Sequence, residues 1–199
     1  MKLRYSPTSP YVRKVMVVAI ETGLEDQIEI IPTDPWDSYT DLPADNPLGK
    51  VPALLTDDGL TLFDSPVICE FLDTLHDGQP LFPPVGEARW KALRWQALGD
   101  GILDACVMRR VEQKFRKKHL QSLEWIARQQ RTIVCSLEEL NRGLSQNSVT
   151  IGHVSVGCAL GYLDLRFPED EWRALCPSLA IWYEIFSQRS SMLATRMDS

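Results

Sequence analysis

The sequence predicts an α/β N-terminal domain followed by an all-α helical C-terminal domain. Within the first 80 residues, short apolar runs alternate with a helical pattern and then form a hairpin signal. Residues 79–86 include three prolines and a glycine, which is typical of a linker between domains. From residue 87 to residue 144 no proline occurs, and apolar residues recur with the period of a helix. We therefore expect domains at 1–78 and 87–199, joined by the linker 79–86.

The N-terminal domain begins with a β-α-β pattern. Residues 2–5 and 28–31 are short strand candidates, and the apolar residues between them recur at helical spacing. This spacing predicts an amphipathic helix over about 10–22, which Gly23 ends. Because a helix crosses between them, the two strands are expected to pair in parallel. Residues 33–49 are polar and hold three prolines, so we expect one irregular helix and loops there.

A hairpin and a second helix complete this domain. Apolar residues 53–56 and 60–63 flank Asp57-Asp58-Gly59, and Asp-Gly between two apolar runs predicts a hairpin turn. Ser65 then precedes Pro66 and a run with helical periodicity. Serine at the N-cap and proline at the first helical position are typical of a helix start.

The second half of the chain is predicted to be helical throughout. Residues 87–144 should form two long helices with a break near 117–122, and residues 150–166 a third. Shorter helices should begin at Pro168 and Pro177. Thr150 can cap the third helix, but His153 stands where a capping box has its carboxylate, and we expect that histidine not to serve. Gly152 should weaken the first turn by up to about 1 kcal/mol.

Composition excludes several classes of ligand and location. The first 80 residues hold 5 Lys and Arg against 14 Asp and Glu, whereas nucleic-acid binding needs clustered cations. No apolar run approaches the roughly 20 residues that span a membrane, and no secretory signal is expected. The five cysteines show neither CxxC nor Cys/His metal spacing. We expect a cytoplasmic protein that binds no nucleic acid, membrane or metal.

The stretch TSPYVRK at 8–14 places a hydroxyl at the start of the first helix. Ser9 precedes Pro10 and is therefore the predicted N-cap. The free N–H groups of the first turn and the helix dipole carry about half a positive charge, which stabilises an anion. A thiolate is such an anion, and a hydroxyl that donates to it lowers the thiol pKa further. Ser9 is a candidate for holding a thiolate, with plain capping as the alternative.

Two further segments suit a ligand with a peptide backbone and two charged ends. Val51 precedes Pro52 at the start of a strand, which is a candidate position for a cis bond. A cis bond would turn the peptide groups of Val51 outward, where they can pair with an extended peptide. Asp64 and Ser65 place a carboxylate and a hydroxyl at a second helix N-terminus. Asp64 suits an ammonium group, and Ser65 with the helix end suits a carboxylate.

These segments, in this order and spacing, resemble the glutathione transferase family. The resemblance is carried by TSPYVRK at 8–14, NPLGKVPAL at 46–54 and LFDSPVICEFL at 62–72. It covers the whole chain and implies a thioredoxin-like N-terminal domain that binds glutathione. It also implies that the helical domain supplies most of the second-substrate pocket, around residues 94–117. The first stretch is similar to that of bacterial and plant members that use serine.

The resemblance implies a role for each matching residue. Ser9 matches the residue that hydrogen-bonds the glutathione sulfur, and neighbouring Thr8 is the alternative. Position 9 is serine and Val12 stands three residues later, so no redox CxxC is present. Transfer through a thiol of the enzyme itself is therefore disfavoured.

The remaining matches concern the rest of the glutathione molecule. Val51 matches the residue whose backbone pairs with the cysteinyl moiety, and Asp64 and Ser65 match the pair that holds the γ-glutamyl end. Lys50 matches a position that meets the glycine carboxylate, with a solvated lysine as the alternative. Asp100 matches an acidic position that reaches the γ-glutamyl ammonium across a dimer interface, with a helix-face charge as the alternative.

Three residues near Ser9 are not expected to take part. Arg13 and Lys14 lie one turn into the first helix and are expected on a solvated face. Tyr11 does not match the tyrosine of animal-type members, and we expect it to face a partner or solvent.

The resemblance implies a glutathione transferase that activates the glutathione thiol for attack on a hydrophobic, electrophilic small molecule, as in detoxification. Glutathione is then the co-substrate, with no metal and no nucleotide, and a homodimer is expected. Two alternatives stay open. One is a glutathione transferase-like binding or adaptor protein without catalysis, and the other is a glutathione-dependent isomerase, dehalogenase or peroxidase.

Overall fold

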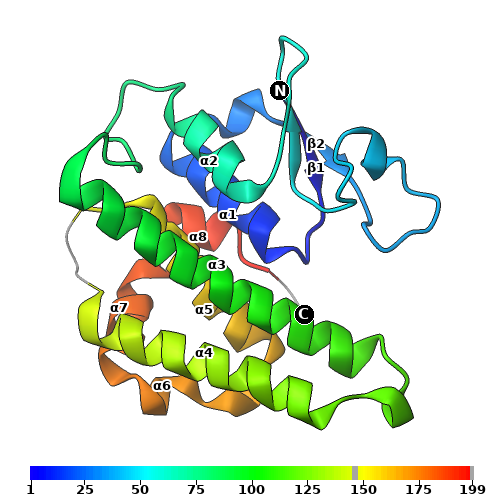
Figure 1. The fold of residues 1–199 in the computed structure, drawn as a ribbon. Helices are drawn as coiled ribbons and strands as arrows, with labels where there is room; N and C mark the ends of the chain where they lie inside the picture. The colour runs from blue at the N-terminus through cyan, green and yellow to red at the C-terminus, as the bar shows by residue number, and fades with distance from the viewer. Residues whose placement is uncertain (145–147, 198–199) are drawn as a thin grey trace.

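A computed structural model describes residues 1–144 and 148–197, and it shows two packed domains (Figure 1). The N-terminal domain holds a sheet with helices, and the second domain contains only helices among the residues described. In Figure 1 the sheet domain lies above the long green helix α3 (Gly86–Lys114), most of the other helices lie below it, and the red helix α8 (Ser190–Ala194) lies next to the sheet domain on the upper side. The predicted fold class is therefore confirmed.

The sheet has four strands in the order β2-β1-β3-β4. The strands are β1 (Lys2–Tyr5), β2 (Glu29–Pro32), β3 (Ala53–Leu55) and β4 (Thr61–Leu62). β1 and β2 are parallel, as the predicted crossover requires, whereas β3 is antiparallel to both β1 and β4. Leu3 lies at the centre, paired with Ile30 on one side and Leu54 on the other.

Two helices lie on the same side of this sheet (Figure 1). They are α1 (Pro10–Glu21) and α2 (Ser65–Asp73), and Gly23 ends the first in a left-handed conformation. Two short 3₁₀ turns also lie in this domain, η1 (Glu25–Gln27) between α1 and β2 and η2 (Leu42–Ala44) between β2 and β3. The irregular helix expected within 33–49 is reduced to η2, because prolines interrupt the helical hydrogen-bond ladder there.

The helical domain is built around α5 (Ile151–Arg166), which packs mainly against α3 (Gly86–Lys114). The other elements described here are η3 (Lys118–Leu120), α4 (Leu123–Gly143), η4 (Pro168–Asp170), α6 (Trp172–Leu175), α7 (Pro177–Phe186) and α8 (Ser190–Ala194). The break predicted near 117–122 is confirmed by η3. A Cβ at Gly99 would lie 2.7 Å from the backbone of Ser155, so glycine is needed for α3 and α5 to approach.

The start of α5 differs from the prediction. His153 does complete the capping box, because its Nδ1 accepts a hydrogen bond of 3.1 Å from the Thr150 N–H. Gly152 also has a packing reason, since a Cβ there would lie 2.7 Å from the Ala92 carbonyl and from Trp95. The buried imidazole thus supplies the acceptor that a carboxylate supplies in the usual capping box.

Arg13 and Lys14 are buried, so the prediction of a solvated face is wrong. Lys14 is 0% exposed, and its Nζ lies 2.6 Å from Oδ1 of Asp100 on α3. Arg13 donates from Nη2 to the backbone carbonyl of Met192 on α8, at 3.1 Å. The face of α1 that an isolated helix would present to water is covered here by the second domain.

Replacing Lys14 with methionine tests how strongly this buried pair holds the domains together. Lys14→Met leaves the Asp100 carboxylate buried without its cation, and we expect a loss of about 3–5 kcal/mol of unfolding free energy at neutral pH. Burial raises the pKa of the Asp100 carboxyl, so its ionised form destabilises the folded variant. The loss should therefore shrink as the pH falls below that pKa and grow as the pH rises through it. Urea unfolding at several pH values measures both effects.

Two variants serve as controls for this experiment. Lys91→Met breaks the exposed Glu87–Lys91 pair and should leave the urea midpoint unchanged. The double variant Lys14→Met/Asp100→Leu replaces both buried charges and should recover most of the lost stability. A loss in Lys14→Met that is equal at pH 5 and pH 8 would contradict this account.

Candidate functional site

The topology brings the three motif segments to one end of the sheet. Arg4 near the end of β1 pairs with Ala53 at the start of β3, and Leu54 pairs with Leu62 in β4. The chain therefore leaves β1 toward α1, enters β3 and leaves β4 toward α2 at neighbouring positions. Val51 packs against Val12 in the first turn of α1, within a small buried cluster. Residues 39 positions apart in sequence, Val12 and Val51, thus meet at the N-terminus of α1.

Ser9 is the N-cap of α1, as predicted. Its Oγ accepts a hydrogen bond of 3.3 Å from the N–H of Val12, and Pro10 follows in the first turn. A hydroxyl that accepts one hydrogen bond still has its own proton to donate. Ser9 is partly buried, whereas neighbouring Thr8 is exposed. Capping and donation to an anion at this helix end are therefore compatible.

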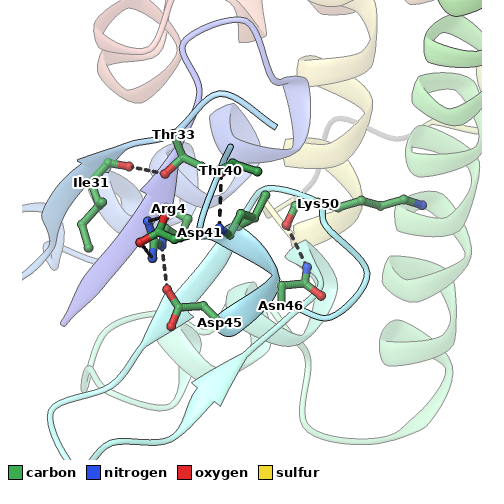
Figure 2. Close-up of polar contacts among 9 residues, drawn as sticks. Arg4, Ile31, Thr33, Thr40, Asp41, Asp45, Asn46 and Lys50 are labelled. Carbon is green, nitrogen blue, oxygen red and sulfur yellow. Dashed lines mark hydrogen bonds and ion pairs between the residues drawn. The ribbon is translucent and has the colours of Figure 1, made fainter. Parts of the chain in front are cut away.

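The segment leading into β3 is shaped by Asn46, whose part in the site the sequence analysis did not identify. The Asn46 side chain is 1% exposed, and its Nδ2 donates to the Lys50 carbonyl at 2.8 Å. Its Oδ1 accepts from the N–H of Leu48 at 3.0 Å. Figure 2 shows this bond to the Lys50 carbonyl, with the lysine side chain extending away from it. Val51 follows directly, and its bond to Pro52 is cis, as expected.

Arg4 attaches the loop between β2 and β3 to the sheet (Figure 2). Its Nε donates to Asp45 Oδ2 at 2.6 Å, and its Nη1 and Nη2 donate to the Asp41 carboxylate at 2.8 and 3.0 Å. The hydrogen bond from Arg4 lowers the pKa of Asp41, so that carboxyl stays ionised. A single guanidinium on β1 thus fixes both sides of η2, because its planar fork matches two carboxylates.

Asp64 and Ser65 lie at the start of α2, but the helix begins one residue earlier than predicted, at Ser65 and not at Pro66. Asp64 is the N-cap by backbone conformation, and Ser65 is already the first helical residue. The Asp64 side chain is exposed and makes no capping hydrogen bond, while Ser65 is buried. The Phe63–Asp64 peptide is also cis. The Asp64 carboxylate is therefore exposed at the N-terminus of α2 and does not accept a capping hydrogen bond.

Tyr11 is bonded within the chain, which differs from the expectation that it faces a partner or solvent. Its hydroxyl donates a short hydrogen bond to the carboxylate of Asp104 on α3. Burial, followed by the hydrogen bond to Asp104, raises the pKa of the Tyr11 phenol. The phenol therefore stays protonated, and the contact joins α1 to α3 two residues beyond Ser9. Asp100 lies one helical turn before Asp104 and contacts Lys14 of the same chain.

Comparisons of this sequence with family models and with known proteins agree on one family. The N-terminal domain model of glutathione S-transferase matches residues 8–75, and the C-terminal domain model matches residues 124–184. An uncharacterised GST-like protein of Escherichia coli, YibF, is 32% identical over 200 residues, covering 98% of each chain. The chain belongs to the glutathione transferase family. Its sheet domain is accordingly the family's thioredoxin-like domain.

Solved structures of other family members superpose over the whole chain. A glutathione transferase family member from Pseudomonas fluorescens Pf-5, with bound glutathione, is 43% identical with a TM-score of 0.96. The superposition covers 100% of this chain and 99% of that one. A glutathione S-transferase from Methylobacterium radiotolerans, in complex with glutathione sulfonate, is 36% identical with a TM-score of 0.91. That match covers 100% of this chain and 95% of the other.

All five cysteines of this chain are free thiols, and two buried ones, Cys69 and Cys158, are poor nucleophiles. Burial raises the pKa of the Cys69 thiol to about 12 and that of the Cys158 thiol to about 11. Both therefore stay protonated near neutral pH, and only a thiolate attacks or exchanges. Neither thiol is therefore available as a nucleophile beside α1 near neutral pH.

Within 1–144 and 148–197, no group of three or more His, Cys, Asp or Glu is arranged to hold a metal ion. No helix in those ranges is both long enough and apolar enough to cross a membrane.

Substitution of Asn46 tests whether it shapes the segment before β3. Asn46→Ala removes the part-buried hydrogen bonds to the Lys50 carbonyl and from the Leu48 N–H, and at about 0.5–1.5 kcal/mol for each bond we expect a loss of about 1–3 kcal/mol of unfolding free energy. Asn46→Asp keeps the acceptor for Leu48 but loses the donor, so it should also destabilise at neutral pH. Urea unfolding measures both variants. Asn46→Ala with the stability of the wild-type protein would show that the turn holds without this side chain.

Proposed function

We propose that this protein is a glutathione transferase that activates the glutathione thiol at the N-terminus of α1 for attack on an electrophilic small molecule. The observation that carries this proposal is the position of Ser9. Its hydroxyl caps α1 and retains a proton to donate, and it accepts from the N–H of Val12, whose side chain packs with Val51 just before β3. Family membership and glutathione-bound relatives support glutathione as the ligand.

In this proposal glutathione lies extended between α1, β3 and the start of α2. The backbone of Val51, held in place through Asn46 and Lys50, pairs with the cysteinyl moiety. The exposed Asp64 carboxylate takes the γ-glutamyl ammonium, and Ser65 with the N–H groups of α2 takes its carboxylate. The exposed Lys50 ammonium meets the glycine carboxylate.

The chemistry then follows from electrostatics at a helix end. The thiol releases its proton to solvent, and the thiolate is stabilised by the α1 dipole and by the Ser9 hydroxyl. The sulfur lone pair forms a bond to an electrophilic carbon, and the leaving group departs with its bonding electrons. For an addition, the electrons move onto the acceptor, which then takes a proton. The protein contributes thiolate formation and positioning, so the product is a glutathione thioether.

Assembly and location form part of the same proposal. A homodimer is proposed from the family. Because Lys14 contacts Oδ1 of Asp100, only the other carboxylate oxygen of Asp100 would reach the γ-glutamyl ammonium of a glutathione bound to the partner subunit. The five free cysteines support a reducing compartment, and we place the protein in the cytoplasm. A role in detoxification would follow from conjugation of hydrophobic electrophiles.

Substitutions of Ser9 and Ser65 should have different effects. Ser9→Ala removes the donor to the thiolate, so kcat/KM at pH 7 should fall about 10- to 100-fold, while glutathione affinity changes less than about threefold. The pH at which activity rises should move upward by one or more units, because the thiol ionises less readily. Ser65→Ala should instead weaken glutathione binding about tenfold. Calorimetric titration and a pH series of conjugation rates measure these quantities.

Thr8→Ala is the matched control for Ser9→Ala and should behave as the wild-type protein. Equal loss of glutathione affinity in Ser9→Ala and Ser65→Ala would contradict this division of roles. Binding of glutathione without turnover of any electrophile would favour the non-catalytic alternative. Turnover restricted to hydroperoxides, haloalkanes or isomerisable substrates would favour the narrower enzyme classes.

A further inference from the structure

Arg110 on α3 and Arg166 on α5 are half-buried arginines that have no carboxylate partner in residues 1–144 and 148–197. Arg109, next to Arg110, shows the usual arrangement, because its guanidinium is paired with Asp170. The Nε of Arg166 is itself buried and has no hydrogen-bond partner in those ranges. Most buried donors in proteins are satisfied, so this one is a candidate for a bond to a bound group.

Both guanidinium groups lie near the phenol of Tyr162 on α5. The central guanidinium carbon of Arg166 lies 5.8 Å from the centre of the Tyr162 ring. Burial raises the pKa of the Tyr162 phenol, and the positive charges of Arg110 and Arg166 act against that rise. Tyr162 is 3% exposed and stays protonated near neutral pH. The three side chains therefore form one cluster, with two cations beside a neutral hydroxyl.

The carboxylates nearest to the two arginines in sequence are bound to other residues. Their contacts are Asp104 with Tyr11, Glu112 with Arg116, and Asp164 with Arg173. The two guanidinium charges of the cluster are therefore not neutralised by these neighbours, and an anion from outside the chain would be attracted to them.

Arg110 lies close to the level of Ser9 along α3. The contacts of α1 with α3 described above advance in opposite directions along the two helices, so the helices run antiparallel here. Tyr11 bonds to Asp104, and Ser9 lies two residues before Tyr11, a rise of about 3 Å. Arg110 lies six residues after Asp104, a rise of about 9 Å. Arg110 is therefore about 6 Å beyond Ser9 along α3.

α5 runs beside α3 in the same direction, and Figure 1 shows it passing behind α3. A Cβ at Gly152, near the start of α5, would lie 2.7 Å from the Ala92 carbonyl. Further along both helices, a Cβ at Gly99 would lie 2.7 Å from the Ser155 backbone. These contacts advance together, so the C-terminal parts of both helices lie toward the same end of the domain.

The last turns of α5 reach the N-terminal half of α1. A Cβ at Gly161 would overlap the guanidinium of Arg13, which lies one turn into α1. Tyr162 follows directly, and it also raises the pKa of Tyr11, after larger contributions from burial and from the hydrogen-bonded carboxylate. Arg166 is one helical turn further along α5. Both arginines therefore lie on the side of the helical domain that borders the N-terminus of α1.

We infer that Arg110 and Arg166 bind a carboxylate of the second substrate, so that the electrophile recognised by this protein is anionic. This inference rests on the proposed function, because it takes the glutathione sulfur to lie at Ser9. A guanidinium offers parallel N–H donors that match the two oxygens of a carboxylate. The carboxylate would give the buried Nε of Arg166 its partner, with the reacting carbon toward Ser9. The family resemblance implies a hydrophobic electrophile, whereas this cluster favours one with a charged end.

Two glutathione conjugates of matched length test this inference without requiring turnover. S-(5-carboxypentyl)glutathione ends in a carboxylate and S-hexylglutathione in a methyl group, so the ratio of their dissociation constants cancels the contacts of glutathione itself. Arg110→Met and Arg166→Met should each shift this ratio against the carboxylate by about 5- to 15-fold, between the values for an exposed ion pair and for a buried charge-assisted hydrogen bond. Added salt should shift the wild-type ratio in the same direction, because it screens the two charges. Calorimetric titration measures every ratio.

Arg131→Met is the matched control, because Arg131 is exposed on α4 and the same charge is lost. It should leave the ratio unchanged, and melting curves should show that every variant is folded. If a methionine variant does not fold, the salt series on the wild-type protein decides. A ratio unchanged in both Arg110→Met and Arg166→Met, or a wild-type ratio insensitive to salt, with S-hexylglutathione still bound, would overturn the inference and leave the proposed function intact. Failure of the wild-type protein to bind either conjugate would overturn both.

Discussion

The buried pair of Lys14 and Asp100 is the constraint on which the arrangement of the two domains depends. A fully buried ammonium needs an anion, and the anion is supplied by a helix of the other domain. The pair thereby fixes α1 against α3 at one position along both helices. The N-terminus of α1, with Ser9, and the exposed face of α3 consequently keep a fixed relation. A substrate held by one domain can react with a group positioned by the other only if that relation is kept.

The site itself is prepared by groups that do not meet the ligand in the proposed reaction. Arg4 and Asn46 hold the loop that leads to Val51, and both act through hydrogen bonds to residues near the strand. These hydrogen bonds restrict the loop before any ligand binds. The loss of conformational entropy on binding is therefore smaller. The carboxylate of Asp64 is left uncommitted at its helix end. The protein thus orders the backbone in advance and leaves the charged ends of the site accessible.

The helical domain contributes a different kind of chemistry from the sheet domain. The sheet domain offers hydroxyl, carboxylate and backbone groups, which suit a polar tripeptide. The helical domain offers the guanidinium groups of Arg110 and Arg166, which lie together beside Tyr162. In our proposals, the tripeptide and the charged end of its reaction partner are therefore recognised by different domains.

The order of the elements and the local chemistry of the site could be predicted from short stretches of sequence. Ser9 before Pro10, Val51 before Pro52 and the glycine after α1 are signals that act over a few residues, so they could be read directly. Their combination also indicated the family. The burial of side chains and their pairing across long separations in sequence became visible only in the folded chain. Lys14, Asn46 and the pair of Arg110 and Arg166 owe their roles to neighbours brought together by folding, and no local pattern encodes those contacts.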